Sequence, residues 1–312
     1  MKKEFRVISL IVAMLMIMLS GCNQQPTYTE GPAIWKVTDP DTKSTLYLFG
    51  SIHVADDTAY PLNETITTAY EESDALAVEV DIKAFADDTE AQAAFSADLM
   101  YTDGGTITDE IDESLIEQLE EVLDGSEALE GVPMEYLRYM RPYMWLSLMN
   151  ELSFEKSGLS AEKGIDMHFL ELAHEEGKEI LEVESMESQM DMLMNFSPEI
   201  QSYQLEGVAD IDATAEELTE LYTAWKAGDL EGYIAASEDE SKIQELSEDE
   251  RAAMEDYELQ MITERNILMA DAAESYMKDG KNVFFVVGAL HMVDDGGIVE
   301  LLADKGYKVT RI

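Results

Sequence analysis

The chain has 312 residues, of which 46% are hydrophobic, so it can bury the core of one large domain or two modest ones. Twenty Lys and Arg against 67 Asp and Glu give a formal net charge of −47. A surface of this sign repels nucleic acid phosphates and excludes a nucleic-acid-binding role. Because the acidic residues are spread over most of the chain, we interpret them as a solvated surface rather than a device that attracts cations or basic peptides.

The N-terminus has the parts of a bacterial lipoprotein signal peptide over residues 1–22. It begins with positive charges at Lys2, Lys3 and Arg6. The apolar run Val7–Leu19 follows, and it is shorter than the ~20 residues that a membrane-spanning helix needs. The sequence LSGC then resembles a lipobox, in which cleavage precedes a cysteine that becomes lipidated. We therefore expect an extracytoplasmic protein anchored to the cell membrane through a lipid on Cys22, with residues 23–32 as a polar tether.

Residues 33–312 predict a single α/β domain with a central, mostly parallel sheet. The runs Ile34–Thr38 and Thr45–Phe49 indicate two strands of a hairpin around the turn sequence DPDTKS. A helix over Pro61–Ser73 and a strand over Asp74–Asp81 are expected next. Strand, helix and strand in this order are the unit of a parallel sheet.

Residues 84–160 predict a long helical insertion. Within it, Asp112–Leu123 is amphipathic. The segment Tyr136–Asn150 is apolar nearly all round, so we expect it to be buried as core or as the lining of a groove rather than as a cofactor site. Ile165–Glu176 is a further amphipathic helix, and Gly177 fits its C-cap.

The rest of the chain continues the alternation of helices and strands. The expected elements, in order, are a strand over residues 178–185, acid-rich helices over 198–262 with a break at KAGD, a long helix over 247–277, a buried central strand over 283–287, a helix over 297–305 and a final strand over 307–312.

The pattern G-x-[IL]-H-x-x-D-D occurs twice, at Gly50–Asp57 and Gly288–Asp295, and each copy follows an apolar strand. We expect each glycine to let the chain turn sharply as it leaves the sheet. His53 and His291 would then occupy equivalent positions beyond the carboxyl ends of their strands, where ligands bind in open α/β sheets. The two aspartates that end each pattern are interpreted as helix N-caps rather than as acids that support the histidines.

Acidic residues end two other predicted strands. Alternation places Glu79 and Asp81 on one face of their strand, and Glu182 and Glu184 on one face of theirs. Buried acids are unfavourable unless they are paired or bound to a metal. Two imidazoles with one or two of these carboxylates make a plausible ligand set for a divalent ion such as Mn²⁺, Co²⁺ or Zn²⁺.

Three other residues need an interpretation. His168 and His174 fall on different faces of their predicted helix, so we interpret both as surface groups. Arg265 has no charged neighbour four residues away, although it lies in a helix of a chain that is poor in arginine. A partner across the fold, or an anionic reaction intermediate, would explain it better than a local ion pair.

From Ala33 to the C-terminus the chain resembles the TraB/GumN family, which includes the TIKI-type metalloproteases and the pheromone-shutdown proteins. The resemblance rests on an ordered set of residues, namely Gly50, His53, Glu79, Gly164, Asp166, Gly177, Lys178, Glu184, Gln189, Arg265, Gly288 and His291. It implies an α/β core similar to the erythromycin-esterase and ChaN-like folds. It also implies a metal-dependent hydrolase role for the two histidines, with the acid and the arginine in support. Asp294 departs from the glycine that the resemblance leads us to expect in the second loop.

Two functions follow from these residues. The leading hypothesis is a membrane-anchored, metal-dependent hydrolase, with a peptide or protein outside the cytoplasm as the first choice of substrate. His53 and His291 would hold the ion, and Arg265 would stabilise the developing oxyanion. Of Glu79 and Glu184, one would be the third ligand and the other the general base. The alternative is a non-catalytic lipoprotein that sequesters a ligand or peptide at the same strand ends. The sequence contains no H-E-x-x-H, which excludes a zincin. It also contains no G-x-S-x-G and no catalytic cysteine, which argues against acyl-enzyme chemistry.

Overall fold

The computed structural model describes residues 30–126, 129–237, 247–293 and 296–312. The predicted signal peptide, its Cys22 and nearly all of the tether lie outside this part of the chain. Within it, no helix combines the length and the apolar character that crossing a bilayer requires.

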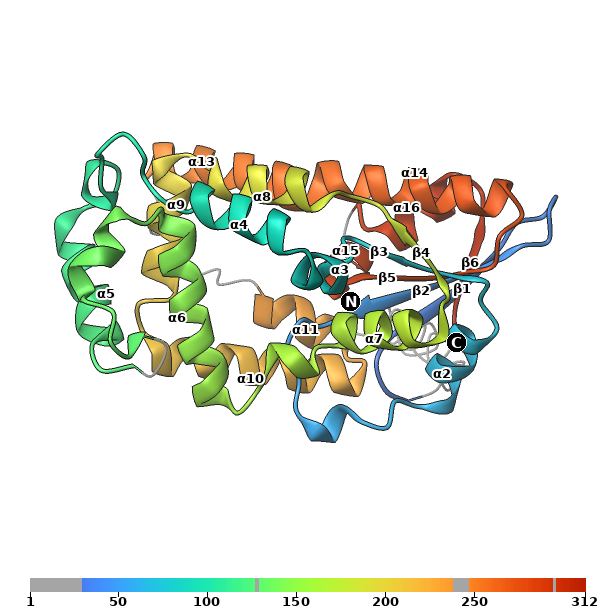
Figure 1. Ribbon diagram of the computed structural model, residues 1–312. Helices are drawn as coiled ribbons and strands as arrows, with labels where there is room; N and C mark the ends of the chain where they lie inside the picture. Colours follow the sequence, from blue (N-terminus) through green and yellow to red (C-terminus); the bar gives the residue numbers. More distant parts are fainter. Residues whose placement is uncertain (1–29, 127–128, 238–246, 294–295) are drawn as a thin grey trace, which may run out of the picture.

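Six strands form one sheet in the order β4-β3-β5-β2-β1-β6 (Figure 1). Their bounds are β1 Ile34–Thr38, β2 Thr45–Ser51, β3 Ala75–Val78, β4 Glu179–Glu182, β5 Val283–Gly288 and β6 Lys308–Arg311. The strands from β4 to β2 pair in parallel, whereas β1 pairs antiparallel with both β2 and β6. The sheet is therefore mixed and mostly parallel, which confirms the predicted fold class and the β1–β2 hairpin.

The strand β5 lies in the middle of the sheet between β3 and β2. Its side chains are buried from Val283 to Val287, as expected for a strand with neighbours on both sides and helices on both faces. β5 pairs with β2 so that Gly50 stands opposite Val287 and Ser51 opposite Gly288. The two G-x-x-H patterns thus lie on adjacent parallel strands, offset by one residue.

Helices cover both faces of the sheet. On one face, α2 (Glu64–Glu71), α7 (Ile165–Glu176) and α10 (Ile211–Ala227) share a core with the strands. On the other face, α14 (Glu264–Lys278) and α16 (Ile298–Asp304) do the same. Figure 1 shows α14 running along one side of the sheet and α7 along the opposite side.

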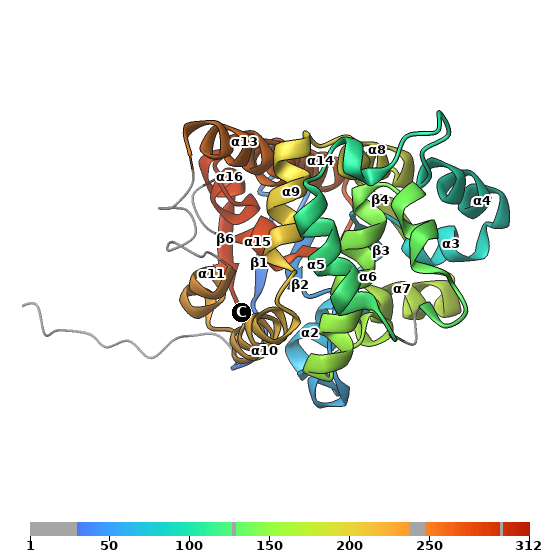
Figure 2. The same cartoon turned by 90° about the vertical axis from the view of Figure 1, so that its left-hand side faces the viewer.

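The predicted insertion forms a helical layer beside the carboxyl ends of the strands, and Figure 2 looks directly onto it. α5 (Glu113–Leu123), α6 (Pro142–Ser157) and α9 (Pro198–Gly207) contribute to a third core, which includes the fully buried Trp145. Further helices are α3 (Ile82–Asp87), α4 (Thr89–Asp98), α8 (Met186–Met194), α11 (Leu230–Ser237), α13 (Glu248–Glu258) and α15 (Ala289–Met292).

The prediction of one buried segment over Tyr136–Asn150 is wrong at its start. A 3-10 helix, Met134–Tyr139, comes first, and α6 begins only at Pro142. Tyr136 and Tyr139 are 56% and 46% exposed. Proline lacks an N–H and forces the preceding residue out of the helical region, so the chain cannot run as one helix across this position. Pro142 instead takes the first position of α6, where its missing N–H is harmless.

The long helix predicted over residues 247–277 is present with one irregularity. A π-helical turn, Leu259–Thr263, joins α13 to α14. Such turns often occur at functional sites. Arg265 is the second residue after this turn.

Candidate functional site

Three of the predicted site residues converge around Gly288, the last residue of β5. A methyl group on its Cα would lie 3.5 Å from Glu79 Oε1, 3.6 Å from His291 Cδ2 and 3.7 Å from His53 Nε2. The carboxyl edge of the sheet therefore brings both histidines and one acid to a single point, where open α/β sheets bind their ligands.

The two histidines do not occupy equivalent positions after their strands, contrary to the sequence-based expectation. His53 lies in the loop after β2 with 70% of its side chain exposed, whereas His291 lies in α15 and is 5% exposed. Neither glycine has the positive φ of a tight turn. Gly50 lies within β2, where a methyl group would approach the Ala289 Cα to 3.0 Å. Close approach to this backbone, rather than turning, is what requires glycine at position 50.

His53 is held by a carboxylate that sequence reasoning gave no separate role. Its Nδ1 lies 2.8 Å from Asp166 Oδ2, and the other Asp166 oxygen accepts a hydrogen bond from Ser51 Oγ at 2.5 Å. Asp166 sits in the first turn of α7, which the buried Phe169 anchors against the sheet. The Asp166 carboxylate raises the pKa of His53 to about 9. Burial opposes ionisation of Asp166, but the charge and hydrogen bond of His53 outweigh it and lower the pKa of Asp166. His53 lines the pocket described below, and most of its side chain is exposed.

His291 has an amide as its partner. Its Nδ1 lies 2.7 Å from Asn266 Oδ1, and Asn266 Nδ2 donates to the Gly296 carbonyl at 3.0 Å. An amide oxygen only accepts, so Nδ1 carries the proton and Nε2 keeps its lone pair. Burial lowers the pKa of His291 to about 4, and the ring is therefore neutral at pH 7.

A buried ion network completes the site. Arg265 donates to both oxygens of Glu184, at 2.7 and 2.8 Å, and to Glu79 Oε2 at 2.5 Å. The Gly288 N–H donates to Glu79 Oε1 at 2.8 Å, and Gln189 Nε2 lies 3.4 Å from both acids. Burial opposes the charge of Glu79, but the histidines, Arg265 and this N–H outweigh it and lower the pKa of Glu79. The expected partner of Arg265 across the fold is thus confirmed.

The alternation predicted for the acids does not continue past the strand ends. β3 ends at Val78 and β4 at Glu182, so the chain turns before the alternation can apply. Asp81 caps α3 and pairs with His174 Nε2 at 2.8 Å. Glu182 accepts a hydrogen bond from the Asp81 N–H at 2.9 Å. These contacts direct Asp81 and Glu182 away from the site, and they give the surface residue His174 a partner.

Two other predictions have different outcomes. His168 is half-buried, with its ring 4.9 Å from that of Tyr60, so its interpretation as a surface group is wrong. Asp56 caps the 3-10 helix Asp57–Ala59, as expected. In the second pattern, the residue at the N-cap of α16 is Gly297, while the aspartates at 294 and 295 lie outside the described residues.

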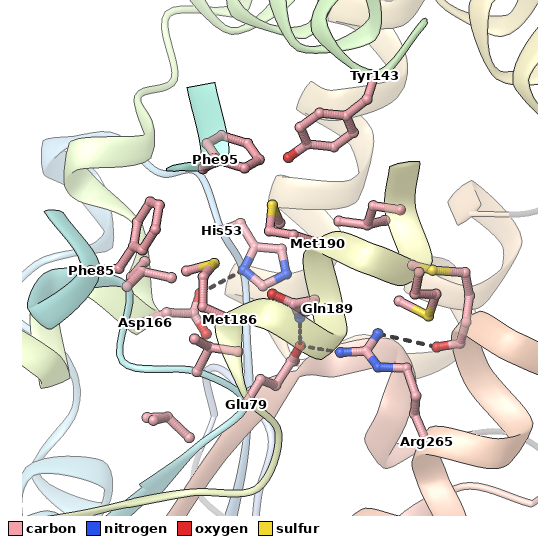
Figure 3. Close-up of a pocket in the computed structure, with 16 residues that line it drawn as sticks. His53, Glu79, Phe85, Phe95, Tyr143, Asp166, Met186, Gln189, Met190 and Arg265 are labelled. Atoms are coloured by element: carbon pink, nitrogen blue, oxygen red, sulfur yellow. Dashed lines mark hydrogen bonds and ion pairs between the residues drawn. The ribbon is translucent and has the colours of Figure 1, made fainter. Parts of the chain in front are cut away.

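A pocket of about 460 Å³ opens above His53, Glu79 and Arg265 (Figure 3). This volume falls within the usual range of ligand sites. Its walls come from α3, α4, α6 and α8 and include Phe85, Phe95, Tyr143, Met186 and Met190. The groove-lining role expected of the segment 136–150 is met by Tyr143.

The histidines fit a metal ion better than the acids do. With each Nδ1 engaged, Nε2 of His53 and of His291 has no partner among the described residues. Ligating histidines typically have this arrangement, in which a carboxylate or carbonyl fixes the other ring nitrogen. In the described chain, however, no three His, Cys, Asp or Glu side chains stand ready as a ligand group. The described residues thus bring two imidazoles near Gly288, and the nearest oxygen is Glu79 Oε1, which accepts one hydrogen bond from the Gly288 N–H.

Sequence reasoning missed Asn266, and it assigned Asp166 and Gln189 no function of their own. A signal existed for Asn266, which follows Arg265 directly and is a second polar side chain in a buried stretch of helix. Asp166 offered a weaker signal, because an acid in the first turn of a helix is common for electrostatic reasons alone.

The site residues all fall within a single family match. The sequence model described as the TraB/PrgY/gumN family matches residues 33–311, nearly the whole chain. Searches of the curated proteins and of the solved structures gave no significant match.

Proposed function

Because the chain belongs to the TraB/PrgY/gumN family, we propose that the pocket is the active site of a metal-dependent hydrolase. The proposed substrate is a peptide or protein outside the cytoplasm. The observation that carries the proposal is the convergence of His53 Nε2, the His291 ring and Glu79 Oε1 around Gly288. Of these three residues, His53 and Glu79 also line the pocket, whereas His291 is buried beside them.

His53 and His291 would hold a divalent ion such as Mn²⁺, Co²⁺ or Zn²⁺ through Nε2. When bound, such an ion lowers the pKa of a coordinated water and polarises a substrate carbonyl. Asp166 and Asn266 supply the hydrogen bonds that fix the two rings in orientation.

The two acids have different roles in this proposal. Glu79 lines the pocket and its pKa is lowered, so it is ionised and available to accept a proton from an attacking water. Glu184 is not part of the pocket wall, and it binds Arg265 through two hydrogen bonds. We assign Glu184 to positioning Arg265, whose guanidinium faces the pocket and would stabilise negative charge on the substrate oxygen.

The lipid anchor remains part of the proposal and is supported by the LSGC sequence alone. Labelled palmitate should be incorporated into the full chain and not into a Cys22→Ala variant. Equal labelling of both proteins would remove the anchor from the proposal.

Metal analysis with peptide turnover tests the hydrolase. We expect about one divalent ion per chain, none in the double variant His53→Ala/His291→Ala, and cleavage of a peptide library that a chelator stops. His174→Ala, which removes a histidine outside the site, serves as the matched control and should behave like the wild type. Equal metal content in the wild type and the double variant, or no cleavage by the metal-loaded protein, would refute the proposal.

One observation favours the non-catalytic alternative. Arg265 already binds both acids of the site, and methionines and aromatic rings line much of the pocket wall. A protein that only sequesters a peptide needs no free base. Mass spectrometry of the bound peptide separates the two functions, because sequestration leaves it intact in a stoichiometric complex.

A further inference from the structure

The pocket adjoins a second hollow, which lies between α4 and α8. This hollow has a volume of about 750 Å³. Phe85, Phe95, Met186 and Met190 line both spaces, so the two are adjacent. We call the second space the α4–α8 groove. Figure 2 shows α4 at the right-hand edge of the view and apart from α8.

The helices around this groove are poorly covered by the rest of the protein. None of α3, α4 and α8 has a fully buried residue. A surface helix normally buries its apolar stripe, yet α8 carries methionines at Met186, Met190, Met192 and Met194. These flexible side chains suit a surface that adapts to different apolar partners. The apolar lining of the groove is therefore available to an occupant.

The charged lining of the groove is entirely acidic. It contains Asp98, Glu187 and Asp191, and no Lys, Arg or His contributes to its wall. No ion pair within the described part of the chain joins these three acids to a cation. Arg265, the cation of the neighbouring pocket, is already bound by two acids. Asp191 accepts a hydrogen bond from Asn195 Nδ2 at 2.8 Å. An occupant with a positive charge would therefore meet carboxylates that have no cationic partner among the described residues.

We infer that the α4–α8 groove is a subsite that selects a basic side chain on a peptide. The peptide is apolar where it passes Phe85 and Phe95, and it carries Lys or Arg where it reaches Asp98, Glu187 and Asp191. This inference deepens the proposed function and rests on it, because it takes the site at His53 as the place where the peptide is processed. A second copy of this chain does not fit, since its net charge of −47 would bring acids to an acidic groove.

Three labelled heptapeptides test the inference on the full, metal-free chain. Each has five alternating leucines and valines followed by two lysines, two glutamines or two glutamates. We expect the lysine peptide to bind about tenfold more tightly than the glutamine peptide, as two or three exposed ion pairs allow. The glutamate peptide should bind most weakly. The lysine preference should decrease with added salt.

The variant Asp98→Asn/Glu187→Gln/Asp191→Asn should bind the three peptides alike. Its matched control, Glu175→Gln/Glu216→Gln/Glu220→Gln, removes three exposed acids from other helices and should keep the preference. Equal affinities in the wild type, or a preference that survives in the groove variant, would overturn the inference. A groove covered by a second copy would bind none of the peptides, and that result would overturn it too.

Turnover measured in parallel keeps the two proposals separate. If no peptide is cleaved but the lysine preference depends on the groove acids, the hydrolase fails and the subsite stands. If cleavage depends on His53 but the three peptides bind and react alike, the subsite fails and the hydrolase stands.

Discussion

Replacing Arg265 with methionine tests whether the buried ion network holds the site together. Methionine keeps much of the side-chain length but removes the bonds to Glu184 at 2.7 and 2.8 Å and to Glu79 at 2.5 Å. The side chains of Glu79 and Glu184 are only 14% and 8% exposed. Without Arg265, both acids would keep only the long hydrogen bonds from Gln189, and Glu79 would also keep the hydrogen bond from the Gly288 N–H.

Removing one partner of a buried ion pair typically costs about 3–5 kcal/mol, because the remaining charge stays desolvated. We expect a loss of this size in the free energy of unfolding of Arg265→Met at pH 7. In the wild type the folded pKa of Glu79 is lowered, so its charge stabilises the fold above the unfolded pKa of about 4.3. That contribution is lost as the pH falls through the lowered folded pKa. Without Arg265 the folded pKa of Glu79 rises, so the variant takes up a proton at a higher pH than the wild type, and the cost of the substitution should shrink as the pH falls from 7 to 4.

Urea unfolding at pH 7 and pH 4 measures both effects, with Arg138→Met as the control. Arg138 also binds two glutamates, Glu113 and Glu120, but its side chain is 29% exposed. Exposed pairs contribute at most about 1 kcal/mol each, so Arg138→Met should cost much less than Arg265→Met. Equal costs for the two variants, or a cost of Arg265→Met that does not change with pH, would refute the reasoning.

The Asp166→Asn variant should return the pKa of His53 from about 9 towards its ordinary value of 6.5, as an NMR titration of the ring would show. The raised pKa of His53 stabilises the wild type fully below about pH 6.5 and no longer above about pH 9. The variant should therefore lose stability at pH 6 and little at pH 10. An unchanged titration of His53 in the variant would contradict its pairing with Asp166. Gly288→Ala adds a methyl group at ordinary contact distances, so stability should change by about 0.5 kcal/mol or less, while metal binding falls at least tenfold because the methyl occupies the meeting point of the site. Gly50→Ala would bring a methyl group within 3.0 Å of the Ala289 Cα, and urea unfolding should show a loss of about 1–3 kcal/mol in stability. A larger loss for Gly288→Ala than for Gly50→Ala would contradict the close approach of Gly50 to Ala289.

The sheet was predictable because its signals are local. The uninterrupted apolar run of β5 indicates a central strand, and the turn sequence between β1 and β2 indicates their hairpin. The meeting of His53 and His291 needed one further step, namely that the carboxyl ends of parallel strands share an edge. Register was not predictable in this way, because pairing offset by one residue depends on contacts between β2 and β5 that neither strand encodes alone.

The partners of the histidines were not predictable for a related reason. Asp166 reaches His53 from α7, and Asn266 reaches His291 from α14. Each contact depends on how a helix packs against the sheet, and nothing in the local pattern around an acid or an amide reports that distance. The start of α6 is different, since Pro142 was visible in the sequence and its restriction on the preceding residue indicates a helix boundary.

The difference between the partners explains how one repeated motif can supply two unlike groups. A carboxylate beside His53 favours the imidazolium, and solvent reaches the ring from the pocket. An amide beside the buried His291 gives no such charge, so this ring stays neutral with a lone pair on Nε2 at every pH near 7. His291 is thus a preformed nitrogen donor, whereas His53 can act as one only after it gives up a proton. The repeat therefore brings both rings to the same edge of the sheet, and the partner from α7 or α14 determines what each ring can do.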